Sequence, residues 1–278
     1  MKSYLAGAVQ MTSVPDLDKN LAQAEDLIQI AVNRGAELVC LPENFSFLGN
    51  EEQKSKLAPE IAIQSEKFLI TMAQRYQITL LGGGFPVPVT AKAEESSAQP
   101  QKMYNTALLV SPEGLELSRY RKMHLFDVNL PDGNTYRESE AVLAGSDLPI
   151  VYQSPSLGNL GLSVCYDVRF PELYRYLAAN GADVLFVPAA FTAFTGKDHW
   201  QVLLQARAIE NTCYVIAPAQ VGKHNPRRQS HGHAMIIDPW GVVLADAGDQ
   251  IGVAVAEIQP SRLEQVRRQM PSLKHRVL

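Results

Sequence analysis

A glutamate, a lysine and a cysteine each follow a short strand-like run of this 278-residue chain. Glu43 follows LVCLP, Lys122 follows LSRYR and Cys165 follows LGLSV. In open α/β sheets, chemistry takes place just outside the carboxyl ends of the strands. The three side chains are therefore candidates for one shared cleft.

These three groups together could perform acyl transfer through a thiol. A free thiol has a pKa of about 8.5, so it needs a neighbouring base to become a nucleophile. The Glu43 carboxylate could take the proton, and Lys122 could stabilise the thiolate and the oxyanion that forms when sulfur attacks a carbonyl or nitrile carbon. The corner at Cys165 would direct the backbone N–H of Tyr166 at the same oxyanion, as the strained corners of other hydrolases do.

Each of these residues, taken alone, also has an ordinary structural explanation. A cysteine at a strand end is more often a packing residue than a nucleophile. Glu43 alone would be a loop carboxylate, and Lys122 alone a solvated strand end. Because spacing along the chain does not show that the three meet, residue types alone leave both readings open.

The elements that must position these residues alternate between strand-like and helix-like patterns, which indicates an α/β fold. Apolar residues recur at helical spacing from Leu17 to Ala31, with Asp16 as the expected cap and Gly35 as the stop. Residues 86–102 are polar and rich in proline and serine, so we expect a mobile surface loop there. Further helices are expected around 68–73 and at 171–180 and 198–211, and strands at 4–11, 37–43, 78–84, 105–110, 116–122, 160–164, 183–188, 213–219, 233–238, 241–245 and 252–258.

The two halves of the chain repeat this order: each has a strand, a helix and a second strand, after which a polar residue follows. We therefore expect a single domain over residues 1–278 with an internal pseudo-repeat. The composition, 46% hydrophobic and 19% charged, is ordinary for a soluble globular protein. A core of this size needs no disulfide or metal to be stable.

Charge and hydropathy argue against nucleic acid and membranes as partners. The formal net charge is −4, and no basic stripe is visible. No apolar run approaches the roughly 20 residues that a membrane span needs, and we expect no signal peptide at the N-terminus. The sparse, odd set of Cys40, Cys165 and Cys213 fits a reduced, cytoplasmic compartment.

No metal or cofactor is expected. The six histidines form no zinc pattern, and HGH at 231–233 is expected in a loop before a strand. GGG at 82–84 lacks the GK[ST] that would make it a phosphate loop. Trp200 is expected to pack into the core from a helix that Asp198 caps.

Three motifs resemble those of the nitrilase superfamily of carbon–nitrogen hydrolases. LPENF resembles its glutamate motif, YRKMHLFD its lysine motif and SVCYDVRFPEL its cysteine motif. Their order and broad spacing also match, and the resemblance extends over nearly the whole chain.

The resemblance implies Glu43 as general base, Lys122 as oxyanion stabiliser and Cys165 as nucleophile. It also implies a second glutamate, for which Glu138 in YRESE fits better than Glu140, with the role of orienting Lys122 or the attacking water. The family fold is a four-layer αββα sandwich, and its members usually form homodimers or larger homo-oligomers.

The stretch AQVGKHNPRRQSHGHAM at 219–235 resembles the deaminated glutathione amidase branch of this superfamily. That reaction splits an amide into 2-oxoglutarate and cysteinylglycine. The implied substrate is a small anionic amide, which cations at the cleft rim would attract. Arg169 and Arg228 are candidates to bind it, although a solvated loop and a structural pair explain these arginines equally well. Gln220 could bond a substrate carbonyl, but a glutamine at a strand end is more often a capping group.

Other functions remain open at this stage. The chain could be an omega-amidase for 2-oxoglutaramate or an N-carbamoyl amidohydrolase of the same superfamily. A member of another class, a catalytically silent binding subunit that kept the fold, is disfavoured by the presence of Glu43, Lys122 and Cys165 together.

Overall fold

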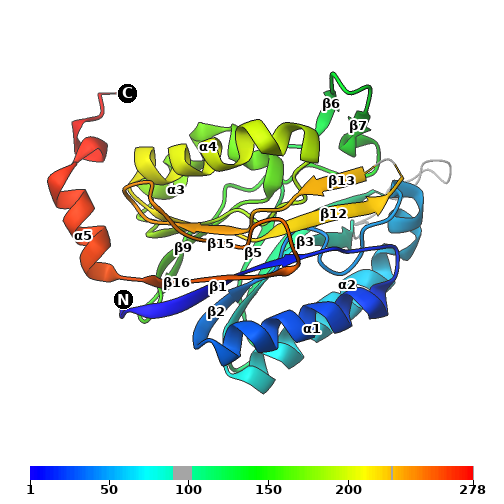
Figure 1. Ribbon diagram of the computed structural model, residues 1–278, viewed down its shortest axis with the longest axis horizontal. Coiled ribbons are helices and arrows are strands. Elements are labelled where there is room, and N and C mark those ends of the chain that lie inside the picture. The colour runs from blue at the N-terminus through cyan, green and yellow to red at the C-terminus, as the bar shows by residue number, and fades with distance from the viewer. Residues whose placement is uncertain (90–101, 227, 278) are drawn as a thin grey trace.

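The computed structural model describes residues 1–89, 102–226 and 228–277. Two β-sheets lie face to face in it, with a pair of helices outside each sheet (Figure 1). The expected αββα arrangement is therefore confirmed. Outside the larger sheet lie α1 (Leu17–Asn33) and α2 (Glu51–Tyr76), and outside the smaller sheet lie α3 (Pro171–Ala179) and α4 (Ala193–Asn211).

The larger sheet has the strand order β13-β12-β1-β2-β3-β4-β5, and β16 pairs antiparallel with β1. Neighbouring strands β1, β2 and β3 run parallel, whereas β4 and β5 are joined to them by antiparallel pairing. The strands are β1 (Tyr4–Met11), β2 (Ala36–Cys40), β3 (Thr79–Pro88), β4 (Met103–Val110), β5 (Glu116–Arg121), β12 (Ala219–Asn225), β13 (Arg228–His231) and β16 (Gly252–Ile258).

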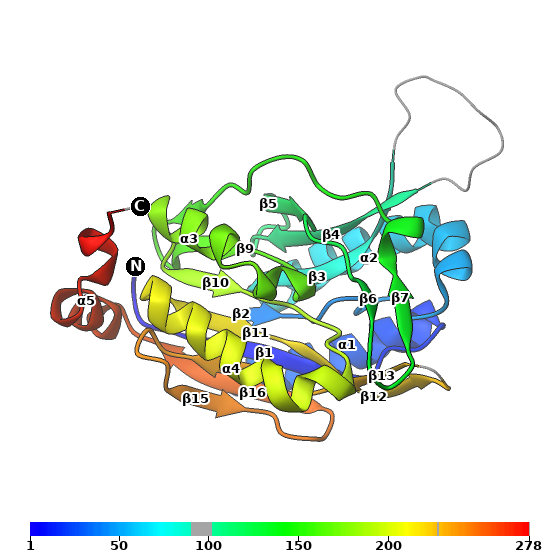
Figure 2. The same ribbon diagram turned by 90° about the horizontal axis from the view of Figure 1, so that it is seen from above.

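The smaller sheet has the order β15-β14-β11-β10-β9-β8, with β9, β10 and β11 parallel. A ribbon of β6 and β7 stands at the end of the molecule where β12 and β13 also lie (Figure 2). The remaining elements are β6 (Asp127–Asn129), β7 (Thr135–Arg137), β8 (Tyr152–Ser154), β9 (Gly158–Leu162), β10 (Val184–Phe186), β11 (Tyr214–Ala217), β14 (Met235–Ile237), β15 (Val243–Asp246), α5 (Pro260–Gln269), and the 3₁₀ helices η1 (Glu138–Glu140), η2 (Cys165–Arg169) and η3 (Ser272–His275).

Strand alternation divides the core into two layers. On β1, Ala6 and Ala8 belong to the core shared with the smaller sheet, whereas Val9 and Met11 pack with α1 and α2. This follows from the two-residue period of a strand, whose successive side chains point to opposite faces. A sheet covered on both faces needs apolar residues at both sets of positions, which is why its strands read as continuous apolar runs.

Most expected elements are confirmed, and α1 begins and ends where the pattern indicated. The Asp16 side chain accepts a hydrogen bond from the Lys19 backbone N–H at 3.1 Å, as an N-cap does. Gly35 follows with a φ of 87°, a left-handed conformation that suits glycine. Trp200 is fully buried, as expected.

Several expected boundaries differ from those of the structure, among them the strand expected at 37–43, which ends at Cys40. The helix expected to start at Asp198 begins at Ala193, with Thr192 as its N-cap residue. The backbone carbonyl of Thr192 accepts a hydrogen bond from the Gly196 backbone N–H at 2.8 Å, which closes the first helical turn before Asp198. The strand expected to end at Gly84 runs on to Pro88, because an irregularity between Gly82 and Phe85 keeps it paired with β4.

Of residues 231–233, expected in a loop that leads into a strand, Gly232 and His233 do lie between strands and before β14, whereas His231 ends β13, which pairs with β12. The expected mobile loop at 86–102 overlaps β3 at its start, and its residues 90–101 lie outside the described residues. None of the helices within the described ranges has the length and apolarity that a membrane crossing requires.

Candidate active site

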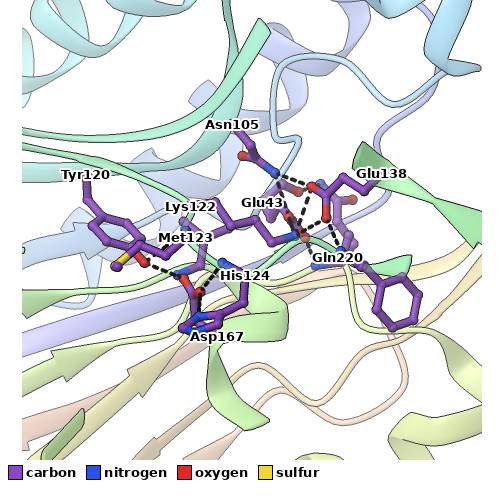
Figure 3. Close-up of polar contacts among 12 residues, drawn as sticks. Glu43, Asn105, Tyr120, Lys122, Met123, His124, Glu138, Asp167 and Gln220 are labelled. Atoms are coloured by element: carbon purple, nitrogen blue, oxygen red, sulfur yellow. Dashed lines mark hydrogen bonds and ion pairs between the residues drawn. The ribbon is translucent and has the colours of Figure 1, made fainter. Parts of the chain in front are cut away.

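Glu43 and Lys122 meet at one edge of the larger sheet. Two antiparallel steps, from β3 to β4 and from β4 to β5, leave β5 parallel to β2, so both strands end at the same edge. Glu43 follows β2 and Lys122 follows β5. The Lys122 Nζ lies 3.0 Å from the Glu43 Oε1, and their side chains are only 2% and 3% exposed (Figure 3).

Glu138, the first residue of η1, completes this charged cluster. Its two carboxylate oxygens lie 3.0 and 2.8 Å from the Lys122 Nζ. The backbone N–H of Phe126 donates to the Glu138 Oε2 at 2.7 Å and fixes the carboxylate. The structure thus places Glu138, rather than the exposed Glu140 of the same turn, against the lysine (Figure 3).

Two further donors hold the glutamates and were missed from the sequence. The Asn105 side-chain amide donates to the Glu43 Oε1 at 2.9 Å and to the Glu138 Oε1 at 3.2 Å. The backbone N–H of Ala190 donates to the Glu43 Oε2 at 2.9 Å. A polar residue in the otherwise apolar strand β4 was the signal for Asn105, whereas a backbone donor leaves no mark in the sequence.

Cys165 sits at a strained corner between β9 and η2. Its φ is 49°, in the left-handed region that non-glycine residues seldom occupy. Such a conformation costs about 1–3 kcal/mol and persists only where the surroundings enforce it. Here the Cys165 backbone N–H is held by the Pro188 carbonyl at 2.9 Å, and the Val164 N–H donates to the Asp167 side chain at 2.8 Å.

Asp167 connects this corner to the lysine strand. The carboxylate is fully buried and accepts a hydrogen bond from the Tyr120 hydroxyl at 2.8 Å. It also accepts from the His124 backbone N–H at 3.1 Å and lies 2.7 Å from the His124 Nδ1 (Figure 3). Because Tyr120 and His124 flank Lys122, this network fixes the position of the lysine relative to Cys165. Sequence reasoning did not identify Asp167.

The charges at the site favour a neutral thiol beside an ionised carboxylate. Burial raises the pKa of Glu43, but the Lys122 charge and hydrogen bonds from Cys165 and Lys122 outweigh it and bring the pKa to about 2. Burial and the Glu43 charge raise the pKa of the Cys165 thiol well above its usual range, despite Lys122. Burial opposes the charge of Lys122, but Glu138 and Glu43 raise its pKa well above the usual value. A base, a proton donor and a cation are therefore in contact.

A cavity of about 290 Å³ opens onto these groups. Glu43, Lys122, Glu138 and Cys165 all line it, as do Tyr166 and Arg228 from the candidates for substrate binding. Within the described ranges, no cluster of three or more His, Cys, Asp or Glu side chains is placed to hold a metal ion. The rest of the lining comes from Asn44, Glu51, Lys54, Phe126, Thr135, Tyr136, Arg137, Glu140, Ala190, Phe191, Thr192 and Thr195.

Gln220 does not line this cavity and its side chain is used elsewhere. Its amide oxygen accepts the Ser13 backbone N–H at 2.9 Å, and its nitrogen donates to the Ser13 hydroxyl at 2.7 Å and to the Glu43 carbonyl at 3.1 Å. The residue is completely buried. Gln220 therefore supports the backbone that carries Glu43, and the expected contact with a substrate carbonyl finds no support in its position.

Arg169 also lies outside the cavity lining. Its guanidinium carbon lies 5.2 Å from the ring centre of Phe191 and 5.9 Å from that of Tyr166. The Nδ1 of His199 is 3.3 Å from both terminal nitrogens. The arginine thus packs behind two aromatic residues that do line the cavity, because these cation–π contacts and His199 hold its head group there.

Comparison with known proteins agrees with this geometry. The sequence model of the family described as carbon–nitrogen hydrolase matches residues 5–268. A deaminated glutathione amidase from Synechocystis is 69% identical over 277 residues, covering 100% of this chain and 99% of the relative. The crystal structure of the Caenorhabditis elegans NitFhit protein superposes with a TM-score of 0.90 at 38% identity, covering 100% of this chain and 66% of that one. A Saccharomyces cerevisiae member of branch 10 of the nitrilase superfamily gives a TM-score of 0.85 at 30% identity, covering 100% and 97%.

Proposed function

Since the chain belongs to the carbon–nitrogen hydrolase family, we propose that it cleaves the amide bond of deaminated glutathione to give 2-oxoglutarate and cysteinylglycine. The family hydrolyses carbon–nitrogen bonds, so the open question is the substrate. The observation that carries this choice is the 69% identity, over the full length, to a deaminated glutathione amidase. In the cell, this activity would act as metabolite repair.

In the first half of the reaction, Cys165 attacks the amide carbonyl carbon. Glu43, already ionised, takes the thiol proton as the sulfur–carbon bond forms. The developing oxyanion is stabilised by the positive charge of Lys122, whose ammonium is held between Glu43 and Glu138 beside Cys165. The backbone N–H of Tyr166 is a second donor, because the first N–H groups of a helix lack intrahelical partners.

Collapse of this intermediate breaks the carbon–nitrogen bond. Glu43 returns its proton to the departing nitrogen, so cysteinylglycine leaves as a neutral amine and a 2-oxoglutaryl thioester remains on Cys165. Water then replaces the dipeptide. Glu43 takes a proton from this water, the resulting hydroxide attacks the thioester carbon, and the proton passes to the departing sulfur. The free thiol and 2-oxoglutarate are regenerated.

Glu138 and Asn105 act by holding the other groups in place. Glu138 contacts the Lys122 Nζ through both oxygens, and Asn105 bridges Glu138 to Glu43. A cation held in advance loses no free energy to reorganisation when charge develops on the substrate. For substrate binding, Arg228 and Tyr166 are placed in the cavity wall, where they would contact the anionic amide.

A substrate panel tests this function directly. Turnover of deaminated glutathione would be measured beside 2-oxoglutaramate, glutamine and an N-carbamoyl amino acid. We expect deaminated glutathione to exceed each of the others by about tenfold or more in kcat/KM, a modest discrimination for a binding pocket. A preference for 2-oxoglutaramate would make the protein an omega-amidase. Absence of turnover on the whole panel would favour a silent binding subunit.

A single domain over residues 1–278, a homodimer or larger homo-oligomer, and a cytoplasmic location belong to the same proposal. Support for the assembly comes from apolar side chains exposed on α4, Val202 and Ile209, which a second copy could cover. Support for the location comes from three cysteines that are all free. Light scattering of the purified protein would measure the assembly; a monomeric mass at micromolar concentration would contradict it.

A further inference from the structure

Lys54 is a buried lysine that the proposed mechanism leaves unused. It lies on α2, its side chain is only 7% exposed, and it lines the active-site cavity. Its Nζ lies 3.1 Å from the Glu51 Oε1, one helical turn earlier. Lysine is almost never buried without a partner or a purpose. Since the ammonium has three donors and Glu51 occupies one, the remaining donors are available to a bound molecule.

The surroundings of Lys54 carry one excess positive charge. Burial raises the pKa of Glu51, but Lys54 and Arg228 outweigh it and hold the pKa below the usual range, so Glu51 is ionised. Arg228 belongs to β13 and lines the same cavity, and its Nε is buried without a hydrogen-bond partner. The Glu51 Oε2 is also buried without one. In the group formed by Glu51, Lys54 and Arg228, two cations face one anion, so a bound carboxylate would balance the charge of this group.

The position of Lys54 along the cavity indicates which part of the substrate it meets. Arg228 and Tyr136 also line two neighbouring hollows of about 420 and 730 Å³, and neither hollow reaches Lys54 or Glu51. The larger hollow reaches Asn50 and Gln53 on the same turn of α2, but Lys54 and Glu51 themselves line the cavity that holds Cys165. The leaving group must depart from this cavity, whereas the acyl group stays in it as the thioester. A group bound by Lys54 is therefore best matched to the acyl part of the substrate.

We propose that Lys54, oriented by Glu51, forms with Arg228 a subsite for the carboxylate of a 2-oxo acid at the far end of the substrate's acyl group. This inference rests on the proposed function and identifies what that site recognises. The carboxylate neutralises the excess positive charge and supplies acceptors to Lys54 and to the Arg228 Nε. Such charge-assisted hydrogen bonds are stronger than neutral ones.

The same charges would reject the amino acid that corresponds to this 2-oxo acid. Glutathione carries an ammonium group where its deaminated form carries a ketone, so that end of the molecule is zwitterionic and has no net charge. It would leave the excess positive charge uncompensated and bring its ammonium towards Lys54 and Arg228. Juxtaposed like charges are an effective means of excluding a wrong ligand.

Three substrates with the same dipeptide separate these effects. Deaminated glutathione has the 2-oxo acid, its 4-oxopentanoyl analogue keeps the ketone but lacks the carboxylate, and glutathione has the amino acid. With Lys54→Met we expect kcat/KM for deaminated glutathione to fall about 30-fold, mainly through KM, and that for the analogue to fall less than about threefold. Lys56→Met is the matched control, because Lys56 lies on the same helix but is exposed; it should change neither value.

A second variant guards against misfolding. Lys54→Met leaves Glu51 without its cation, so the double substitution of Glu51→Gln with Lys54→Met removes both charges together. We expect the double variant to remain folded by circular dichroism and to show the same loss of preference. Equal losses on deaminated glutathione and on the analogue, in either variant, would overturn the assignment, as would a wild-type preference that survives the loss of Lys54.

A binding measurement distinguishes failure of this subsite from failure of the proposed function. In the wild-type protein, 2-oxoglutarate should protect Cys165 from iodoacetamide at least about tenfold better than 4-oxopentanoate, and Lys54→Met should abolish the difference. That result would support the subsite even if deaminated glutathione proved a poor substrate. Turnover of deaminated glutathione without selective protection would leave the function standing and exclude the subsite.

Discussion

The Lys122 ammonium lies 3.0 Å from the Glu43 carboxylate, and both side chains are almost completely withdrawn from solvent. A pair of this kind is weak evidence for stability, because the cost of burying two charges offsets their attraction. Its value lies in chemistry, since the pair holds a charged base and a charged oxyanion donor beside a neutral thiol. Removing one partner would leave the other buried and unpaired.

Substitution of Lys122 should separate catalysis from stability. We expect Lys122→Ala to lower turnover about 100- to 1000-fold, as loss of one oxyanion donor does. It should also lower the free energy of unfolding by about 3–5 kcal/mol, because Glu43 and Glu138 lose their shared cation. Steady-state kinetics and urea unfolding measure the two effects, with Lys56→Ala as control. A loss in turnover of less than about tenfold would show that Lys122 does not act as an oxyanion donor.

The three cysteines should differ in their reactivity. Cys165 lines the cavity and is 8% exposed, whereas Cys40 and Cys213 are completely buried. Burial raises the pKa of all three thiols, that of Cys213 to about 12 and those of Cys40 and Cys165 well above the usual range, so access through the cavity and the Glu43 carboxylate beside it distinguish Cys165. We expect iodoacetamide to label Cys165 first in the native protein, as followed by peptide mass spectrometry. In urea, the three should react alike; equal rates in the native protein would contradict the site.

Acid should destabilise the protein through His224. Burial, with help from the Arg228 charge and against a hydrogen bond from the His224 Nδ1 to the Ser13 carbonyl, lowers the pKa of His224 to about 4. Between about pH 6.5 and pH 4, the unfolded chain binds a proton that the folded chain does not, so the free energy of unfolding falls as pH falls through this window. At pH 5 the expected loss is about 2 kcal/mol relative to pH 7.

Urea unfolding of wild type and His224→Gln at pH 7 and pH 5 measures this loss. The His224→Gln protein should lose about 2 kcal/mol less than wild type between the two pH values, whatever its stability at pH 7. The difference between the proteins isolates His224 from His231 and His233, which both retain. An identical pH dependence would show that His224 is not buried in its neutral form.

Local sequence patterns predicted the α/β class, whereas the four-layer αββα sandwich was implied only by the family resemblance. Glu43 and Lys122 follow strands β2 and β5 of the larger sheet, and Cys165 follows β9 of the smaller one. These three strands are recognisable in the sequence, but the packing of the two sheets that brings Cys165 to the other two residues is not. The strands β6, β7, β8, β12 and β13 were not identified because they are made mostly of polar residues, whereas the equally short β10 and β14 are apolar and were expected. Their absence from the expected elements also hid the position of Arg228 on β13.

Residues that act through long-range contacts could not be found in this way. Asn105 and Asp167 have no distinguishing pattern around them in the sequence. The glutamates that Asn105 bonds lie 62 and 33 residues away along the chain, and Tyr120 and His124, which bond Asp167, lie 47 and 43 residues away. Gln220 was assigned to the substrate because its distance from Ser13, 207 residues along the chain, concealed its true partner. Lys54 looks like any helix-surface lysine in the sequence.

The roles of the two glutamates are the central claim. Glu43 contacts the Cys165 thiol and carries the proton in both halves of the reaction, whereas Glu138 holds Lys122. Glu43→Gln should therefore form no thioester on Cys165, because the thiol keeps its proton and the amine receives none. Glu138→Gln should turn over slowly but still acylate.

Intact-protein mass spectrometry after mixing with substrate and acid quenching measures the thioester directly, with Cys165→Ala as the blank. We predict an adduct of 2-oxoglutaryl mass on the Glu138→Gln protein and none on the Glu43→Gln protein, both being folded by circular dichroism. An adduct on the Glu43→Gln protein, with none on Glu138→Gln, would contradict the account and exchange the two roles.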